Sequence, residues 1–227
     1  MEKIKACLFD LDGVIVDTAR YHYLAWKQLA DELGIAFSPE SNELLKGVSR
    51  MRSLEIILEL GHRELNREEK IACAEKKNAL YLEAVSQIGE DEILPGVRAF
   101  IDELRKRQIG IALGSASKNA SLILQQLNII DLFDVIIDGN KVSKAKPDPE
   151  VFLRGAEELH LKPENCIVFE DAIAGVDAAH QAGMICIGVG DPVTLMNADL
   201  VIPGFQGLTP DLLFQWLQER SSRDKLI

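Results

Sequence analysis

Short apolar segments alternate with helical patterns along the second part of the chain, and this alternation limits the possible fold more than any other feature. Strand-like apolar runs occupy residues 109–113, 134–137, 166–169, 185–189 and 200–202. Helical patterns occupy residues 95–104, 118–127, 149–159 and 172–182, and a last helix begins at Thr209 and Pro210. Because the links between them are short, the alternation predicts a parallel sheet covered by helices on both faces.

The first part of the chain follows a different pattern. Residues 6–9 (ACLF) predict one more buried strand. Helical signals then follow in this order: apolar spacing over residues 21–33, Ser38 before Pro39, apolar spacing over residues 53–60, and Asn66 with Glu69 as a capping box. We therefore predict an α/β core domain from residues 1–16 and 89–227, with fraying at residues 221–227, and an all-helical domain inserted after the first strand. This insertion, residues 17–88, is called the cap segment below.

Polar side chains come directly after several of the predicted strands. They are Asp10 and Asp12 after the first strand, Ser115 after residues 109–113, Lys146 in the loop after residues 134–137, and Glu170 with Asp171 after residues 166–169. Ligands of open α/β sheets bind outside the carboxyl ends of the strands. We therefore expect these side chains to form one site.

The chemistry of this set favours phosphoryl transfer. Several carboxylates at close range repel one another, so a bound cation is needed to neutralise their charge. Oxygen ligands suit Mg²⁺ better than zinc. The Ser115 hydroxyl and the Lys146 ammonium would hold phosphate oxygens. An aspartate can attack phosphorus, which suggests Asp10 as the nucleophile and Asp12 as the group that moves the proton of the leaving or attacking oxygen. Gly13 would let the chain turn sharply after them.

The same residues form four motifs that resemble those of the haloacid dehalogenase superfamily. The motifs are Asp10-Leu-Asp12-Gly-Val, Ser115 after an apolar strand, Lys146-Pro-Asp-Pro, and Glu170-Asp171. Each motif alone is common, but their order is specific, and the resemblance covers essentially the whole chain. It implies a Rossmann-like doubly wound core with a helical cap domain. It also implies Mg²⁺ held by the carboxylates of Asp10, Glu170 and Asp171 and by the backbone carbonyl of Asp12.

The cap segment narrows the resemblance to members of this superfamily that are phosphosugar mutases. The stretches TARYHYLAWKQLADELGI, LKGVSRMRSLE and GSASKNA carry it. It implies interconversion of β-D-glucose 1-phosphate and D-glucose 6-phosphate through an aspartyl-phosphate enzyme and β-glucose 1,6-bisphosphate. The implied substrate contacts are Thr18, His22, Lys46, Gly47, Val48, Ser49 and Arg50 from the cap segment and Ser115, Ala116, Ser117, Lys118, Asn119 and Lys146 from the core. Arg50 would bind the distal phosphate, helped by Lys118 and Asn119.

Simpler interpretations stay open at this point. Ser117 and Asn119 also fit a capping role for the next helix, and Lys46 with Arg50 also fits a solvated basic face. A phosphatase of a small sugar phosphate would use the same carboxylates and differ only in admitting water. A binding module without catalysis is a third hypothesis, and it would predict the loss of Asp10 or of a metal carboxylate.

Charge and composition limit the partners. The net charge is −11 and no basic stripe is visible, so neither nucleic acid nor an anionic membrane is an expected partner. No apolar stretch is long enough to cross a bilayer, and the chain begins directly with a strand rather than with a signal peptide. Among the four cysteines no C-x-x-C pair occurs. We therefore expect a cytoplasmic, monomeric protein that binds a small sugar phosphate.

Overall fold

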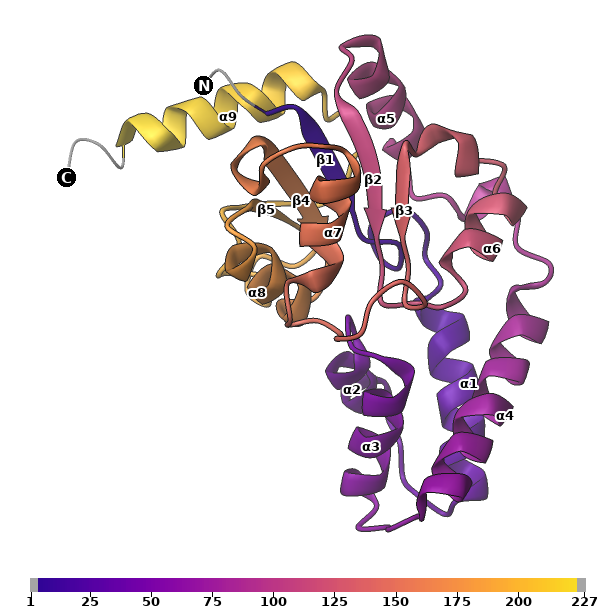
Figure 1. Cartoon of the computed structure of the whole chain (residues 1–227). Coiled ribbons are helices and arrows are strands. Elements are labelled where there is room, and N and C mark those ends of the chain that lie inside the picture. The colour runs from indigo at the N-terminus through magenta and orange to yellow at the C-terminus, as the bar shows by residue number, and fades with distance from the viewer. Residues whose placement is uncertain (1–3, 224–227) are drawn as a thin grey trace.

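A parallel β-sheet lies at the centre of the computed structural model, which describes residues 4–223 (Figure 1). Its strands are β1 (Ala6–Phe9), β2 (Gly110–Gly114), β3 (Val135–Ile137), β4 (Cys166–Glu170), β5 (Ile185–Val189) and β6 (Leu200–Ile202), in the order β3-β2-β1-β4-β5-β6. Phe9 lies level with Leu113 on one side and with Phe169 on the other. The three central strands therefore end together, and the residues that follow them share one edge of the sheet.

Helices cover both faces of this sheet. They are α5 (Val97–Lys106), α6 (Ala120–Gln126), α7 (Glu150–Glu158), α8 (Ile173–Gln181) and α9 (Pro210–Arg223). On one face, α5, α6 and α9 pack over a cluster in which the rings of Phe9, Phe100 and Phe169 contact one another. On the other face, α7 and α8 pack over Leu8 and Val168. The predicted doubly wound parallel sheet is confirmed.

The cap segment is helical and has an apolar core of its own. Its elements are α1 (Ala19–Glu32), α2 (Pro39–Asn42), η1 (Glu43–Leu45), α3 (Arg50–Leu60) and α4 (Arg67–Val85). Trp26, Leu54 and Ile57 are buried in this core. The predicted capping box is confirmed, because the side chain of Asn66 accepts from the Glu69 N–H and that of Glu69 from the Asn66 N–H. Figure 1 shows these helices grouped beyond the carboxyl edge of the sheet. Their boundaries as a domain remain our proposal.

Two linkers join the cap segment to the core, and they run side by side. Val16 in the first forms an antiparallel bridge with Ile93, which follows η2 (Glu90–Glu92) in the second. The Leu94 N–H donates to the Ile15 carbonyl at 2.9 Å. A narrow pair of linkers of this kind is the geometry of a hinge, so the positions nearest to it move least when the cap segment moves.

Several predicted boundaries differ from the observed ones by one to three residues, and two of the differences have local reasons. Helix α3 begins at Arg50 rather than at residue 53, because the Ser49 hydroxyl accepts from the Arg52 N–H and caps the helix there. Helix α5 begins at Val97 rather than at residue 95, because Gly96 before it takes a left-handed φ of +87°. Helix α9 continues through Arg223, so the prediction of fraying is wrong for residues 221–223. Residues 1–3 and 224–227 lie outside the described part of the chain.

The remaining elements are short. The 3₁₀ helices η3 (Ile130–Leu132) and η4 (Pro163–Asn165) lead into β3 and β4. Among the described helices, none combines the length and the apolar character that crossing a membrane requires.

Candidate active site

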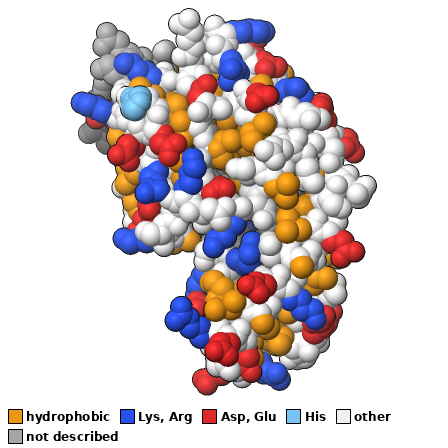
Figure 2. Space-filling view, turned by 45° about the vertical axis from the view of Figure 1, so that its right-hand side comes forward, with side chains coloured by type: hydrophobic (Ala, Val, Ile, Leu, Met, Phe, Trp, Pro, Cys, Tyr) orange, Lys and Arg blue, Asp and Glu red, His pale blue; other side chains and the backbone are white. Residues whose placement is uncertain are grey.

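A cavity of about 500 Å³ lies between the cap segment and the carboxyl ends of the core strands. The predicted site residues that line it are Asp10, Asp12, His22, Lys46, Gly47, Val48, Ser49, Arg50, Ser115, Ala116, Ser117, Lys118, Asn119, Lys146 and Asp171. Thr18 and Glu170 are outside this lining, and both are fully buried. Figure 2 shows Lys and Arg side chains gathered at the waist between the two parts of the molecule. The fold thus brings almost the whole predicted set to one place.

Three carboxylates form a compact cluster at the strand ends. One oxygen each from Asp10, Glu170 and Asp171 lie within 4.8 Å of one another. Burial, followed by the charges of Glu170 and Asp10, raises the pKa of Asp171 well above its ordinary value. Holding three such groups ionised together is unfavourable without a cation. The all-oxygen donor set and its spacing therefore fit a hard divalent metal.

Lys146 compensates part of this charge. Its Nζ lies 2.7 Å from Asp10 Oδ1 and 2.5 Å from Glu170 Oε1, and its side chain is only 1% exposed. Burial opposes the charge of the lysine, but Asp10 and Glu170 outweigh it and raise the pKa of Lys146. Lys146 is therefore a fixed cation next to the predicted nucleophile.

Asp12 lies in a different environment from Asp10. Its Oδ1 accepts a hydrogen bond from the hydroxyl of the buried Thr18, so Thr18 contacts Asp12 from behind rather than lining the cavity. Burial first, and then the charge of Asp10, raises the pKa of Asp12 to about 7. A carboxyl group with such a pKa can both give and take a proton near neutral pH.

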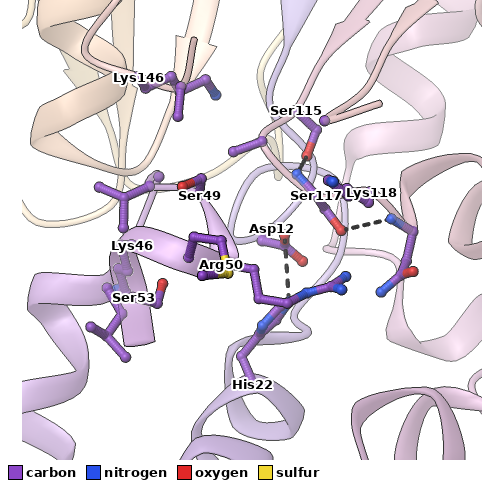
Figure 3. Close-up of a pocket in the computed structure, with 18 of the residues that line it drawn as sticks. Asp12, His22, Lys46, Ser49, Arg50, Ser53, Ser115, Ser117, Lys118 and Lys146 are labelled. Atoms are coloured by element: carbon purple, nitrogen blue, oxygen red, sulfur yellow. Dashed lines mark hydrogen bonds and ion pairs between the residues drawn. The ribbon is translucent and has the colours of Figure 1, made fainter. Parts of the chain in front are cut away.

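His22 faces Asp12 from the cap segment, as Figure 3 shows. Its Nδ1 lies 2.8 Å from Lys77 Nζ, and its buried Nε2 lies 3.9 Å from Asp12 Oδ2 without a hydrogen-bond partner among the described residues. Burial, Lys77 and Arg50 together lower the pKa of His22 well below its usual value. When Lys77 is charged it donates to Nδ1, and the neutral ring then carries its proton on Nε2, directed toward Asp12.

Lys77 also lines the cavity and was not among the residues predicted from the sequence. It is 2% exposed, its Nζ lies over the rings of Trp26 and Tyr81, and burial followed by Arg50 lowers its pKa to about 7. One signal was available, because Lys77 shares a helical face with the buried Ala74 and Tyr81 at spacings of three and four residues. A lysine on a buried face is unusual enough to indicate a functional role.

We expect Lys77→Met to be more stable than the wild type at neutral pH, on the order of 2 kcal/mol, because a buried ammonium is replaced by an apolar chain of similar length. The folded pKa is about 7 and the ordinary value is 10.5. Between these values the unfolded wild type binds more protons, so its stability rises with pH. The advantage of the variant should therefore shrink from pH 7 toward pH 10 in urea unfolding. An advantage that grows with pH would contradict this.

The loop after β2 is held by its own hydroxyl groups. The Ser117 N–H donates to Ser115 Oγ at 3.1 Å, and the Asn119 N–H donates to Ser117 Oγ at 3.2 Å. Ser117 thus stabilises the turn before α6, and the Asn119 side chain makes no capping bond to that helix. Both residues also line the cavity.

The cap segment contributes basic groups to the opposite wall. Lys46 Nζ lies 2.9 Å from Glu43 of the cap segment and 3.9 Å from Asp171 of the core. Arg50 begins α3, and Figure 3 shows it extending into the cavity near Asp12 and His22. Burial lowers the pKa of Arg50, yet a guanidinium stays charged. The cavity therefore has cationic groups on both walls.

Gly13 allows the loop after the two aspartates to pass against Asp171. Its φ is +77°, which confirms the sharp turn predicted from the sequence. A Cβ at this position would lie 2.2 Å from Asp171 Oδ2. Any side chain here would therefore displace a carboxylate of the acidic cluster.

We expect Gly13→Ala to weaken binding of a divalent metal by about 10- to 100-fold, the range seen when the support of a ligand is lost. Gly34→Ala is the matched control, since Gly34 has a φ of +70° but nothing within 4 Å of an added Cβ. Titration calorimetry with Mg²⁺ should separate the two variants. Equal metal affinity in both would show that the contact with Asp171 is unimportant.

Comparisons with known proteins place this site in context. A model of the haloacid dehalogenase-like hydrolase family matches residues 4–183. The chain is 43% identical to the β-phosphoglucomutase of Bacillus subtilis, over 96% of this chain and 97% of that protein. It is similar to the crystal structure of β-phosphoglucomutase from Clostridium difficile, with 43% identity, a TM-score of 0.90, and coverage of 99% and 100% of the two chains. It is also 31% identical to the fructose-1-phosphate phosphatase of Escherichia coli, over 83% of this chain and 97% of that protein.

Proposed function

The chain belongs to the haloacid dehalogenase-like hydrolase family, and on that premise we propose that it interconverts β-D-glucose 1-phosphate and D-glucose 6-phosphate. The observation that carries the proposal is the similarity, at 43% identity, to two β-phosphoglucomutases over nearly the whole chain. This similarity includes the cap segment, where a mutase and a phosphatase of one family are expected to differ. It agrees with the interpretation of the sequence as a phosphosugar mutase.

In the proposed reaction, an oxygen of Asp10 attacks the phosphorus of the bisphosphate intermediate and the bond from phosphorus to the sugar oxygen breaks. Asp12 gives its proton to that leaving oxygen. In the return direction, Asp12 takes the proton from a sugar hydroxyl as the hydroxyl attacks the aspartyl phosphate. The pKa of about 7 for Asp12 supports both roles.

Members of this family use a divalent metal, and we propose Mg²⁺ for this chain. Asp10, Glu170 and Asp171 would hold it, together with the backbone carbonyl of Asp12. When bound, the cation would offset negative charge on the transferring phosphoryl group. Lys146 would add a second positive charge at the same place, because it is fixed by two carboxylates.

The remaining cavity residues are proposed to bind substrate. Ser115, Ala116 and Lys146 would hold the transferring phosphoryl group, and Arg50 with Lys118 and Asn119 would hold the distal phosphate. The planar fork of an arginine binds phosphate through two parallel hydrogen bonds, whichever end of the sugar carries it. His22, Lys46, Gly47, Val48, Ser49 and Ser117 would contribute further contacts. Thr18 would act through Asp12, to which it donates.

A phosphatase of a small sugar phosphate is the second candidate. The 31% identity to a fructose-1-phosphate phosphatase supports it. The two functions differ in what reaches the aspartyl phosphate: a sugar hydroxyl in a mutase, water in a phosphatase. A cap segment that closes over substrate excludes water and so favours the mutase.

The proposal is tested by supplying β-glucose 1-phosphate, Mg²⁺ and a trace of β-glucose 1,6-bisphosphate. Glucose 6-phosphate and inorganic phosphate are then followed in parallel, the first with a coupled dehydrogenase. A mutase forms glucose 6-phosphate with little free phosphate. Free phosphate without glucose 6-phosphate would replace the proposal by the phosphatase.

Three further expectations belong to the proposal. We propose a monomer in the cytoplasm, with a division into a core domain (residues 1–16 and 89–227) and the cap segment. The similarity to bacterial metabolic enzymes supports the location. The separate apolar core of the cap segment supports the division. Gel filtration of the purified protein tests the monomer.

A further inference from the structure

The side chain of Asn119 is used in an unusual way. Asn119 is the N-cap residue of α6, a position where asparagine normally accepts a hydrogen bond from the first helical turn. Here its φ of −102° and ψ of 6° are not those of a capping residue, and the side chain makes no capping bond. Instead, Nδ2 of Asn119 donates to Oδ1 of Asn78 at 2.9 Å. The Asn119 side chain therefore contacts another part of the molecule instead of capping α6.

That contact joins the core to the cap segment. Asn78 lies on α4, and both asparagines line the cavity. An amide nitrogen carries two hydrogens, so Asn119 Nδ2 keeps one donor after its bond to Asn78. A phosphate oxygen can accept that hydrogen. The same amide can therefore contact the cap segment and the substrate together.

We propose that Asn78 is a positioning residue for the distal phosphate, acting by holding the Asn119 amide in its binding orientation. This inference rests on the proposed function, in which Asn119 binds the distal phosphate. Asn78 itself needs no contact with substrate. Its carbonyl oxygen removes the freedom of the Asn119 side chain to turn away, so the free donor faces the ligand before the ligand arrives.

The position of Asn78 indicates that its hydrogen bond to Asn119 persists when substrate binds, instead of breaking as the cap segment moves. Helix α4 ends at Val85 and leads into the second linker, which pairs with the first at Val16 and Ile93. Residues near a hinge are displaced least by domain closure. The bond between Asn78 and Asn119 can thus persist while the more distant parts of the cap segment open and close.

The test compares the wild type with Asn78→Ala, Asn119→Ala and the double variant. The Michaelis constant for β-glucose 1-phosphate reports the distal site, because the phosphoenzyme already carries the transferring group. We expect Asn78→Ala to raise this constant by about three- to tenfold, the effect of one side-chain hydrogen bond, with kcat changed less. The double variant should be no worse than Asn119→Ala, since Asn78 acts only through Asn119.

Hydrolysis of acetyl phosphate separates a positioning role from a general loss of structure, because only the loss of structure would reduce this hydrolysis strongly. Acetyl phosphate phosphorylates the nucleophile without occupying the distal site, so Asn78→Ala should change its hydrolysis by a smaller factor than the Michaelis constant for β-glucose 1-phosphate. Glu83→Ala is the control on the same helix, because this exposed side chain does not line the cavity. An unchanged or lowered Michaelis constant in Asn78→Ala, additive effects in the double variant, or an equal loss of acetyl phosphate hydrolysis would each overturn the inference.

Failure of the proposed function would be visible separately, in the wild type. If the wild type forms no glucose 6-phosphate from β-glucose 1-phosphate, the mutase proposal fails whatever the variants do. The dissociation constant of β-glucose 1,6-bisphosphate, measured by calorimetry without Mg²⁺, then decides the inference, because one of its two phosphates must occupy the distal site. Asn78→Ala should weaken this binding by the same three- to tenfold factor, and equal binding in variant and wild type would reject the positioning role.

Discussion

Asp10→Asn is expected to lower formation of glucose 6-phosphate by at least about 10⁴-fold, because an amide cannot attack phosphorus and the phosphoenzyme cannot form. Hydrolysis of acetyl phosphate should fall by a similar factor, since it needs the same nucleophile. The variant should remain folded. Asparagine has nearly the same shape as aspartate, and Asp10 makes its contacts at the end of a buried strand.

Two measurements check this expectation. Intact-protein mass spectrometry after incubation with acetyl phosphate should show an added phosphoryl group on the wild type and none on Asp10→Asn. Thermal unfolding should show that the variant retains a cooperative transition. A phosphorylated Asp10→Asn protein would place the nucleophile elsewhere and remove the basis of the proposed mechanism.

Lys146→Met is expected to destabilise the metal-free protein by about 3–5 kcal/mol, the usual cost of removing one partner from a buried ion pair. The change leaves Asp10 and Glu170 facing each other without the cation that now lies 2.7 and 2.5 Å from them. Turnover should fall by about 10²- to 10³-fold, as when one fixed charge is lost from a transition-state site. Mg²⁺ should restore part of the stability, because it would bind to the same carboxylates.

Lys144→Met is the matched control, two residues away. Its side chain is 70% exposed and pairs with Asp148 at 3.2 Å, so its removal should change stability by less than about 0.5 kcal/mol. The pKa of Lys146 is raised, so its contribution is present throughout the neutral range and is lost only as pH rises through the folded pKa. Urea unfolding of both variants, with Mg²⁺ and with a chelator, measures these differences. Equal stability of the two variants would contradict the account.

The core of the site could be predicted because its residues come next to strand ends. In a parallel sheet the register places such ends level, as Phe9 lies with Leu113 and Phe169. Asp10, Ser115 and Glu170 are thereby brought together although more than a hundred positions separate the first from the others in the chain. Local sequence and one rule of sheet geometry were sufficient for this part.

The supporting residues could not be predicted in the same way. Lys77 and Asn78 lie in the stretch AEKKNA of α4, which has the composition of an exposed helix face. Only the packing of α4 against α1 turns Lys77 toward Trp26 and His22. Thr18 is a related case, because its contact with Asp12 depends on how the first linker folds back. The spacing of Lys77 from Ala74 and Tyr81 marks its helical face, but the contacts themselves follow from tertiary structure.

The most direct test of the central claim follows the phosphoryl group itself. The enzyme is phosphorylated with radiolabelled acetyl phosphate, separated from the reagent, and chased with β-glucose 1-phosphate and Mg²⁺. We predict that the label appears in β-glucose 1,6-bisphosphate and then in glucose 6-phosphate. Label released as inorganic phosphate at the same rate with and without the sugar phosphate would show that water, and not the sugar hydroxyl, is the acceptor.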